Sequence, residues 1–173
     1  EGIGESDLEE ARFVDNGVTK YRFTLQSPSY IAYMTYGPNR TIREELYRAY
    51  TTRAPQNGAI IDELLALRYE MAQLLGFQSY SDYSLASKMA PSTDAVLKFL
   101  GELSTTSRPQ AQQEINELKT YAKGLDLQSY DTAYYSEKLK IEQYDIDEEQ
   151  YRPYFEQKSV INGMIVFLEK LFG

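Results

Sequence analysis

The sequence predicts a mainly α-helical protein, a multi-helix assembly with a short β-hairpin near its N-terminus. Apolar residues recur at three- and four-residue intervals from Pro28 to Phe172, which is the spacing of one helix face. Asn16-Gly17 lies between two β-favouring runs and is typical of a tight hairpin turn. The composition, 42% hydrophobic and 25% charged over 173 residues, indicates a folded chain. We therefore divide it into residues 1–27, an acidic start with the hairpin, and residues 28–173, a helical segment.

The first ten residues hold five acids and no base, and we expect them to be a solvated or frayed start. After the hairpin, Ser27 is predicted to cap a helix that has Pro28 at its first position. Gly37-Pro38 ends that helix.

The next helix is predicted to begin at a cap formed by Asn39 or Thr41. We place its apolar residues on one face and its arginines on the other, solvated face; the apolar set is Ile42, Leu46, Tyr47, Ala49 and Tyr50, and the basic set is Arg40, Arg43, Arg48 and Arg53.

Helical spacing continues to the C-terminus. A helix at about 59–75 is expected to end with Gly76 in a left-handed conformation, followed by an apolar contact from Phe77. Pro109 should kink or divide the segment 95–123, because proline removes a backbone donor and clashes with the preceding turn. Further helices are predicted at about 79–90, 131–143 and 159–172, with a short helical turn at 146–149.

The last helix, residues 159–172, is apolar on nearly every face. Such a helix is either buried or separated from its partner. If its face is exposed, we expect the isolated chain to form a homodimer through it, since soluble monomers rarely leave large apolar patches open.

Charge and composition exclude several partner classes. The net charge of −8 and the absence of a Lys/Arg-rich run mean that electrostatic attraction does not favour binding of nucleic acid. No apolar run approaches the ~18–20 residues that span a bilayer, and the chain begins with no signal-peptide pattern. With no cysteine, nothing implies an oxidising compartment. We expect a cytoplasmic protein that binds neither nucleic acid nor membrane.

The chain also lacks the residues of common catalytic sites. It has no histidine, so its serines have no obvious base, and zinc would find only carboxylates. The acidic run 145–149 does not fit an EF-hand loop, because Gln150 stands where glycine is required, and it better suits a helix N-terminus. We therefore predict no catalytic residue, no metal ligand and no cofactor in this chain, and no activity from it alone.

Five segments, taken in order, resemble the thimet oligopeptidase / oligopeptidase A family. They are residues 23–30 (FTLQSPSY), 43–54 (REELYRAYTTRA), 67–77 (LRYEMAQLLGF), 130–138 (YDTAYYSEK) and 151–155 (YRPYF). Two positions depart from the family pattern: Tyr130 stands where tryptophan is common, and Glu156 where proline often follows. Neither departure changes the order of the five segments.

The resemblance implies an internal, non-catalytic helical segment of a longer zinc metalloendopeptidase that hydrolyses short peptides. The family's His-Glu-x-x-His zinc motif is absent from these 173 residues, so zinc is expected only in the parent protein. Tyr134, Tyr135, Arg152 and Tyr154 are candidates for lining the substrate channel, because hydroxyl and guanidinium groups suit peptide backbones and carboxylates. Ordinary packing between helices is the alternative role for these four residues. The alternative function is a stand-alone helical interaction module without enzymatic activity.

Overall fold

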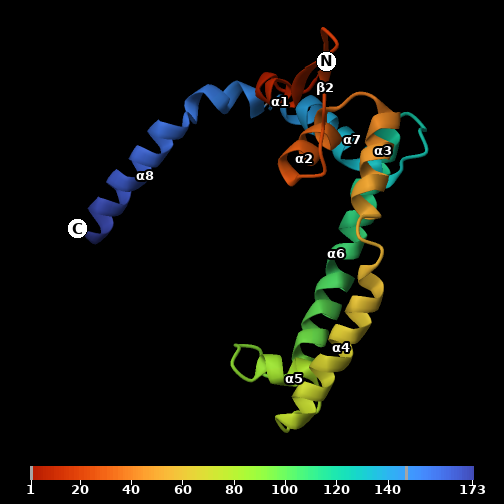
Figure 1. Ribbon diagram of the computed structural model, residues 1–173, viewed down its shortest axis with the longest axis vertical. Coiled ribbons are helices and arrows are strands. Elements are labelled where there is room, and N and C mark those ends of the chain that lie inside the picture. Colours follow the sequence, from red (N-terminus) through yellow and green to blue (C-terminus); the bar gives the residue numbers. More distant parts are fainter. Residues whose placement is uncertain (1, 147) are drawn as a thin grey trace. The chain divides into compact units, whose positions relative to one another are not determined.

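The computed structural model describes residues 2–146 and 148–173 and confirms the mainly α-helical prediction (Figure 1). Within these residues the chain forms eight α-helices, one 3-10 helix and a two-stranded antiparallel sheet. The helices are separated by short connections with turn-forming residues, as helical spacing interrupted by glycine and proline predicts.

The predicted hairpin is present. Strand β1 (Arg12–Asp15) pairs with β2 (Val18–Tyr21) in the register Arg12 to Tyr21 and Asp15 to Val18. Asn16 and Gly17 both have positive φ values, 49° and 75°, which is the geometry of a type I′ turn. The Arg22 N–H donates to the Ala11 carbonyl at 2.7 Å and ties the hairpin to the preceding segment.

Residues Glu5–Ala11 of the acidic start, which the sequence predicts to be solvated or frayed, form helix α1, and Glu5, Glu9 and Glu10 are exposed on it. Glu5 and Asp7 lie in its first turn, where carboxylates are favourable next to the unpaired N–H groups of a helix N-terminus. Ala11 at the other end is buried and anchors the helix. The acids that suggested a solvated start therefore help begin a helix.

Helix α2 (Ser27–Tyr36) begins one residue earlier than predicted, with Gln26 rather than Ser27 at its N-cap. Its buried residues are Ala32, Tyr33 and Met34. Helix α3 (Arg40–Thr51) follows, and the Asn39 carboxamide oxygen accepts from the N–H groups of Thr41 (3.0 Å) and Ile42 (3.3 Å). Of the two caps that the sequence left open, the structure selects Asn39.

The predicted solvated face of α3 was wrong at Arg43. This residue is 1% exposed, whereas Ile42 on the predicted apolar face is 38% exposed. The reason is a buried carboxylate partner far along the chain, Asp131, described below.

The chain folds as two compact units, and the predicted boundary between residues 27 and 28 stays a prediction. Unit 1 comprises residues 1–47 and 127–173; unit 2 comprises residues 48–126. In unit 1, α2 packs against α1 and against α7 (Ser129–Tyr144). The core of unit 1 therefore lies where α2 meets α7.

Unit 2 contains α4 (Asn57–Leu74), α5 (Tyr80–Leu85) and α6 (Thr93–Tyr121). The end of α4 is as predicted: Gly76 has φ +81°, its N–H donates to Gln73 O, and the Phe77 N–H donates to Ala72 O. This pair of bonds is a Schellman motif. Phe77 then packs edge-on against Tyr83, with ring centroids 5.4 Å apart.

Two expectations for unit 2 need correction. Helix α5, capped by the Ser79 hydroxyl, ends at Leu85 rather than near residue 90. Helix α6 is not divided at Pro109 but runs as one helix of 29 residues.

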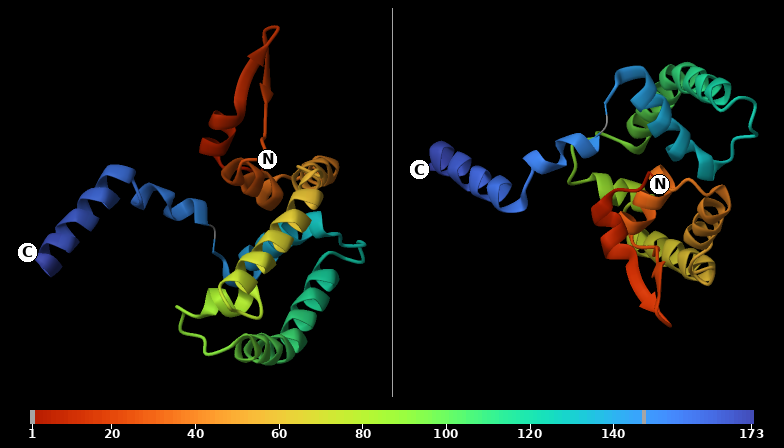
Figure 2. Two further views of the ribbon diagram at one scale, coloured as in Figure 1. Left: turned by 60° about the horizontal axis from the view of Figure 1, so that its bottom comes forward. Right: turned by 90° about the horizontal axis from the view of Figure 1, so that it is seen from above.

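Unit 2 leaves most of its apolar side chains in solvent. Among its described residues, only Ala72 and Leu118 are buried. Helix α4 packs on α5 and α5 packs on α6, and Figure 2 shows α4 and α6 apart from each other within the unit.

The C-terminal part contains the 3-10 helix η1 (Glu148–Tyr154) and α8 (Gln157–Phe172). Of the helical turn predicted at 146–149, residues 148 and 149 lie in η1 and Ile146 precedes it, whereas Asp147 lies outside the described residues. Helix α8 ends at Phe172 as predicted but begins two residues earlier, at Gln157. Its large apolar side chains are 42–82% exposed. Lys158, Asn162 and Glu169 share one side of it, so α8 is apolar over a wide arc rather than all round. None of the described helices is both long enough and apolar enough for a membrane crossing.

Candidate functional site

The most buried polar cluster among the described residues is built around Asp131 in unit 1. Asp131 lies in the first turn of α7 and is fully buried. Its carboxylate accepts from the Arg40 guanidinium (Nη2 2.8 Å, Nε 3.1 Å), from Arg43 Nη2 (2.9 Å) and from the Gln128 N–H (3.1 Å). Every lone pair of this carboxylate therefore faces a donor, as a buried charge requires.

The hydrogen bonds also decide the protonation of Asp131. Burial acts to raise the pKa of this carboxyl, but the bonds from Arg40, Arg43 and the Gln128 N–H outweigh burial and lower the pKa below its ordinary value. Asp131 is consequently ionised at neutral pH. The Asp131 hydrogen bond in turn raises the pKa of Arg40.

Arg43 connects three pieces of backbone. In addition to its bond with Asp131, it donates to the Gly37 carbonyl at 2.7 Å and to the Tyr130 carbonyl at 3.2 Å. Its guanidinium also stacks on the Tyr134 ring, with the central carbon 4.1 Å from the ring centroid. Arg43 thereby holds the end of α2, the start of α3 and the first turn of α7 together.

Arg40 and Tyr130 form the outer side of the same cluster. The Arg40 side chain is 41% exposed and lies 5.2 Å from the centroid of the Tyr130 ring. Tyr130 hydrogen-bonds Glu44, and burial is the main reason that the pKa of Tyr130 is raised. Both arginines thus bond Asp131, and Glu44 interacts electrostatically with Arg40. We call residues Arg40, Arg43, Glu44, Tyr130 and Asp131 the arginine–aspartate network.

The four candidate channel residues separate into distinct environments. Tyr134 and Tyr135 are half-buried on α7, with ring centroids 5.3 Å apart in an edge-on arrangement, and Lys138 lies 4.9 Å from the Tyr134 ring. Tyr154 lies in η1 and is 79% exposed. The Arg152 side chain lies outside the described side chains. The structure brings the two α7 tyrosines together and packs one of them on Arg43.

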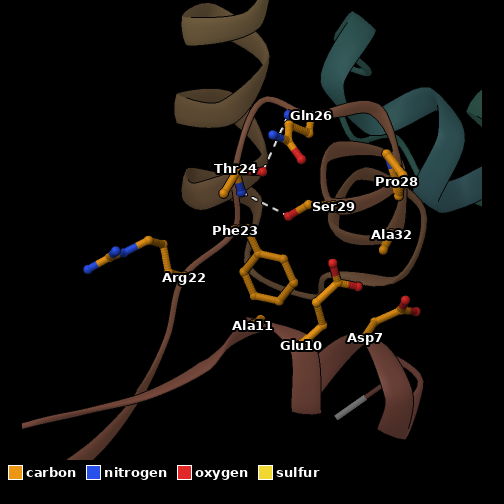
Figure 3. Close-up of a pocket in the computed structure, with 10 residues that line it drawn as sticks. All are labelled: Asp7, Glu10, Ala11, Arg22, Phe23, Thr24, Gln26, Pro28, Ser29 and Ala32. Carbon is orange, nitrogen blue, oxygen red and sulfur yellow. Dashed lines mark hydrogen bonds between the residues drawn. The ribbon is translucent and has the colours of Figure 1, made fainter.

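A small pocket in unit 1 was not expected from the sequence. It has a volume of about 130 Å³ and lies between α1, the chain after β2 and α2. Phe23 is one of its lining residues, together with Asp7 and Glu10 of α1 (Figure 3).

The pocket contains no nucleophile paired with a base. The Ser29 hydroxyl accepts from the Thr24 N–H at 2.8 Å, and the Thr24 hydroxyl accepts from the Gln26 N–H at 3.3 Å, so both hydroxyls close the turn into α2 (Figure 3). Sequence reasoning missed the pocket because it took the acidic start for a solvated tail, and a helical reading of residues 5–11 would have been the signal.

Nor do the described residues form a metal site. The chain has no histidine or cysteine, and within residues 2–146 and 148–173 no three acids come together in a way that could hold a metal ion. Carboxylates alone, dispersed over the surface, do not match the ligand set of a protein zinc site.

The geometry of the described residues does not identify the protein family. Comparison with known proteins does. The sequence model of Peptidase family M3 matches residues 33–173. The chain belongs to peptidase family M3. Oligopeptidase A from Escherichia coli is 45% identical over 166 residues, which cover 88% of this chain and 24% of that protein. Oligopeptidase A from Haemophilus influenzae is 41% identical over 187 aligned residues, 99% of this chain and 28% of that protein.

The similarity extends to a more distant relative. Saccharolysin from Saccharomyces cerevisiae is 30% identical over 187 aligned residues, which cover the whole of this chain and 26% of that protein. The chain therefore spans about a quarter of the length of the relatives it matches. The matched region contains the whole arginine–aspartate network, so this network is part of the M3 segment.

Proposed function

We propose that this chain serves as a non-catalytic helical segment of a zinc-dependent oligopeptidase, a metalloendopeptidase that hydrolyses short peptides. The observation that carries the proposal is the collinear match of residues 33–173 to the M3 family, together with 40–45% identity to oligopeptidase A relatives. The alternative, a stand-alone interaction module, is not favoured, since the similarity covers nearly the whole chain.

Zinc, in this proposal, is bound by residues outside the chain. Zinc sites in proteins use histidine, cysteine and carboxylate in tetrahedral geometry, and the described residues offer no such set. The role of the chain in this proposal is structural. Its arginine–aspartate network fixes α2 and α3 on the first turn of α7.

A second contribution is proposed for the tyrosines. Tyr134 packs between Arg43 and Lys138, which supports a structural role for that ring. Tyr135 and Tyr154 keep part of their surface accessible and suit hydrogen bonds to a peptide backbone. We therefore propose that Tyr135 and Tyr154 border the path of the peptide, together with Arg152, which lies two residues before Tyr154 in the sequence. Replacing Tyr135 with phenylalanine in an active enzyme should then raise KM and leave kcat nearly unchanged.

Location and self-association are also proposals. A cytoplasmic location is supported by the 40% identity to a protein named probable cytosolic oligopeptidase A from Arabidopsis thaliana, although an organellar relative from the same plant is equally similar. The exposed apolar arc of α8 supports homodimer formation by the isolated chain.

A segment exchange tests the proposed function. The matched segment of Escherichia coli oligopeptidase A is replaced by the corresponding residues of this chain, and hydrolysis of short fluorogenic peptides is measured. We expect the chimaera to hydrolyse the peptides that the parent hydrolyses, to lose activity with a chelator and to regain it with zinc.

The control is the same exchange carrying Asp131→Asn, which should fold less stably. A chimaera that is folded, carries one zinc ion and shows no peptide hydrolysis would contradict the proposal.

A further inference from the structure

Helix α4 presents a continuous apolar surface that no described element covers. Its six members lie within roughly 140° of the helix circumference when successive residues are set 100° apart; they are Ile60, Ile61, Leu64, Leu67, Met71 and Leu74. We call these residues the α4 arc. Their exposed fractions run from 37% at Met71 to 87% at Leu74.

The neighbours of α4 in unit 2 leave most of the α4 arc uncovered. Helix α5 has only six residues and meets α4 after the turn at Gly76, where Phe77 packs on Tyr83. Of the residues of α4, only Ala72 is buried. An 18-residue helix extends ~27 Å at 1.5 Å per residue, so most of its apolar length faces solvent.

Charge limits what can cover this surface. Glu63 and Glu70, seven residues apart, line one edge of the α4 arc, and α4 carries three acids against one base, Arg68. A two-fold pair of antiparallel α4 helices would set this acidic edge against its own copy, and like charges placed together disfavour association. A second copy meeting through α4 is therefore a poor occupant. A helix with basic residues along one edge suits the arc better.

We propose that the α4 arc is the docking surface for an amphipathic α-helix from the part of the M3 peptidase that lies outside residues 1–173. This inference rests on the proposed function. It is supported by the length of the relatives, about three-quarters of which lies outside the matched segment. The partner helix carries apolar residues at three- and four-residue spacing and at least one lysine or arginine facing the Glu63–Glu70 edge.

Cysteine labelling tests the inference cleanly, because the chain has no natural cysteine. Leu64→Cys and Leu67→Cys place thiols on the α4 arc, and Ala66→Cys places a matched control on the opposite side of the same helix, where Ala66 is exposed. The labelling rate with a maleimide reagent is compared between the isolated chain and the chimaera, with the unsubstituted chimaera as background.

The expected result is that thiols on the arc react in the isolated chain and react at least ten-fold more slowly in the active chimaera, while the Ala66→Cys rate is similar in both. An active chimaera with fast labelling at Leu64→Cys overturns the docking inference and leaves the proposed function standing. An inactive, folded chimaera with protected thiols contradicts the proposed function instead.

Two further outcomes identify other occupants and overturn the inference. Protection in the isolated chain at every concentration means that α6 closes on α4. Protection that grows with concentration means that a second copy covers the arc. If the chimaera does not fold, the same cysteines are placed at the aligned positions of intact Escherichia coli oligopeptidase A, where fast labelling on the arc contradicts the proposal and protection supports it.

Discussion

At the residue scale, the structure is organised by one buried carboxylate. Asp131 is fully buried yet ionised, because Arg40, Arg43 and the Gln128 N–H all donate to it. A buried charge is tolerated when its partners are complete, and it becomes costly as soon as one partner is removed. The network therefore stabilises unit 1 only while all of its charged partners are present.

Asp131→Asn should destabilise unit 1 by about 3–5 kcal/mol, because it leaves the buried Arg43 guanidinium without its counter-charge. Asp15→Asn is the matched control, since it breaks the exposed ion pair with Lys20, which contributes ~1 kcal/mol or less. Urea unfolding followed by circular dichroism measures both. Equal, small effects of the two substitutions would show that the buried network does not support the fold.

The same carboxylate predicts a loss of stability in acid. Since the folded-state pKa of Asp131 is below its ordinary value of ~3.9, the folded protein holds fewer protons than the unfolded chain in this range. The contribution of Asp131 is thus fully present above the unfolded pKa and is lost as the pH falls through the folded pKa. Urea midpoints measured from pH 7 to pH 3 should fall steeply below about pH 4. The fall should be smaller in Asp131→Asn, and an identical acid profile would refute this role.

At the element scale, glycine has opposite roles in two helices of unit 2. Gly76 has φ +81° and ends α4, whereas Gly101 lies inside α6; a Cβ at either position would meet nothing within 4 Å. The difference between them is therefore conformational rather than steric.

Gly76→Ala should destabilise the chain by roughly 1–2 kcal/mol, the cost of a left-handed conformation for a residue with a Cβ. Gly101→Ala should stabilise it by about 0.5–1 kcal/mol, because alanine is the better helix former. Thermal unfolding of both variants provides the comparison. Two shifts of the same sign would contradict the assigned helix ends.

Local signals explain why most elements were predictable from the sequence. Asn16-Gly17 and Gly76 each determine a backbone conformation by themselves, and both were placed correctly. Arg43 was misplaced because its environment depends on Asp131, 88 residues away, and helical spacing alone puts arginine on the solvated face. The pocket beside Phe23 was missed for a similar reason, since it needs α1 and α2 to pack together.

The prediction about self-association concerns the exposed apolar arc of helix α8. Ile165→Glu together with Leu168→Glu should convert a dimer of the isolated chain to monomer, because both side chains lie on the exposed apolar arc. Burying such side chains contributes about 1.5–3 kcal/mol each, and salt screens the repulsion from the net charge over ~8 Å. Asn162→Glu, on the polar side, is the control and should leave the dimer intact. Light scattering that finds the unsubstituted chain monomeric at high concentration would reject the homodimer.

At the scale of the whole molecule, the chain combines a well-connected polar network with large exposed apolar surfaces. Unit 1 has its arginine–aspartate network, whereas α4, α6 and α8 keep their apolar residues in solvent. A segment that spans about a quarter of its M3 relatives explains this combination, because such surfaces suit contacts with the remaining three-quarters. The fold class and the family were predictable from the sequence, whereas the pairing of distant charges was not.

The central claim, that this chain is a non-catalytic segment of an M3 oligopeptidase, is tested most directly by measuring peptide hydrolysis by the purified chain. Short fluorogenic peptides are incubated with the protease-free chain and an equimolar amount of zinc, and bound metal is measured after gel filtration. We expect no hydrolysis above that of buffer and no zinc retained with the protein, because the chain offers neither histidine nor cysteine. Stoichiometric, chelator-sensitive turnover by the chain alone would contradict the account.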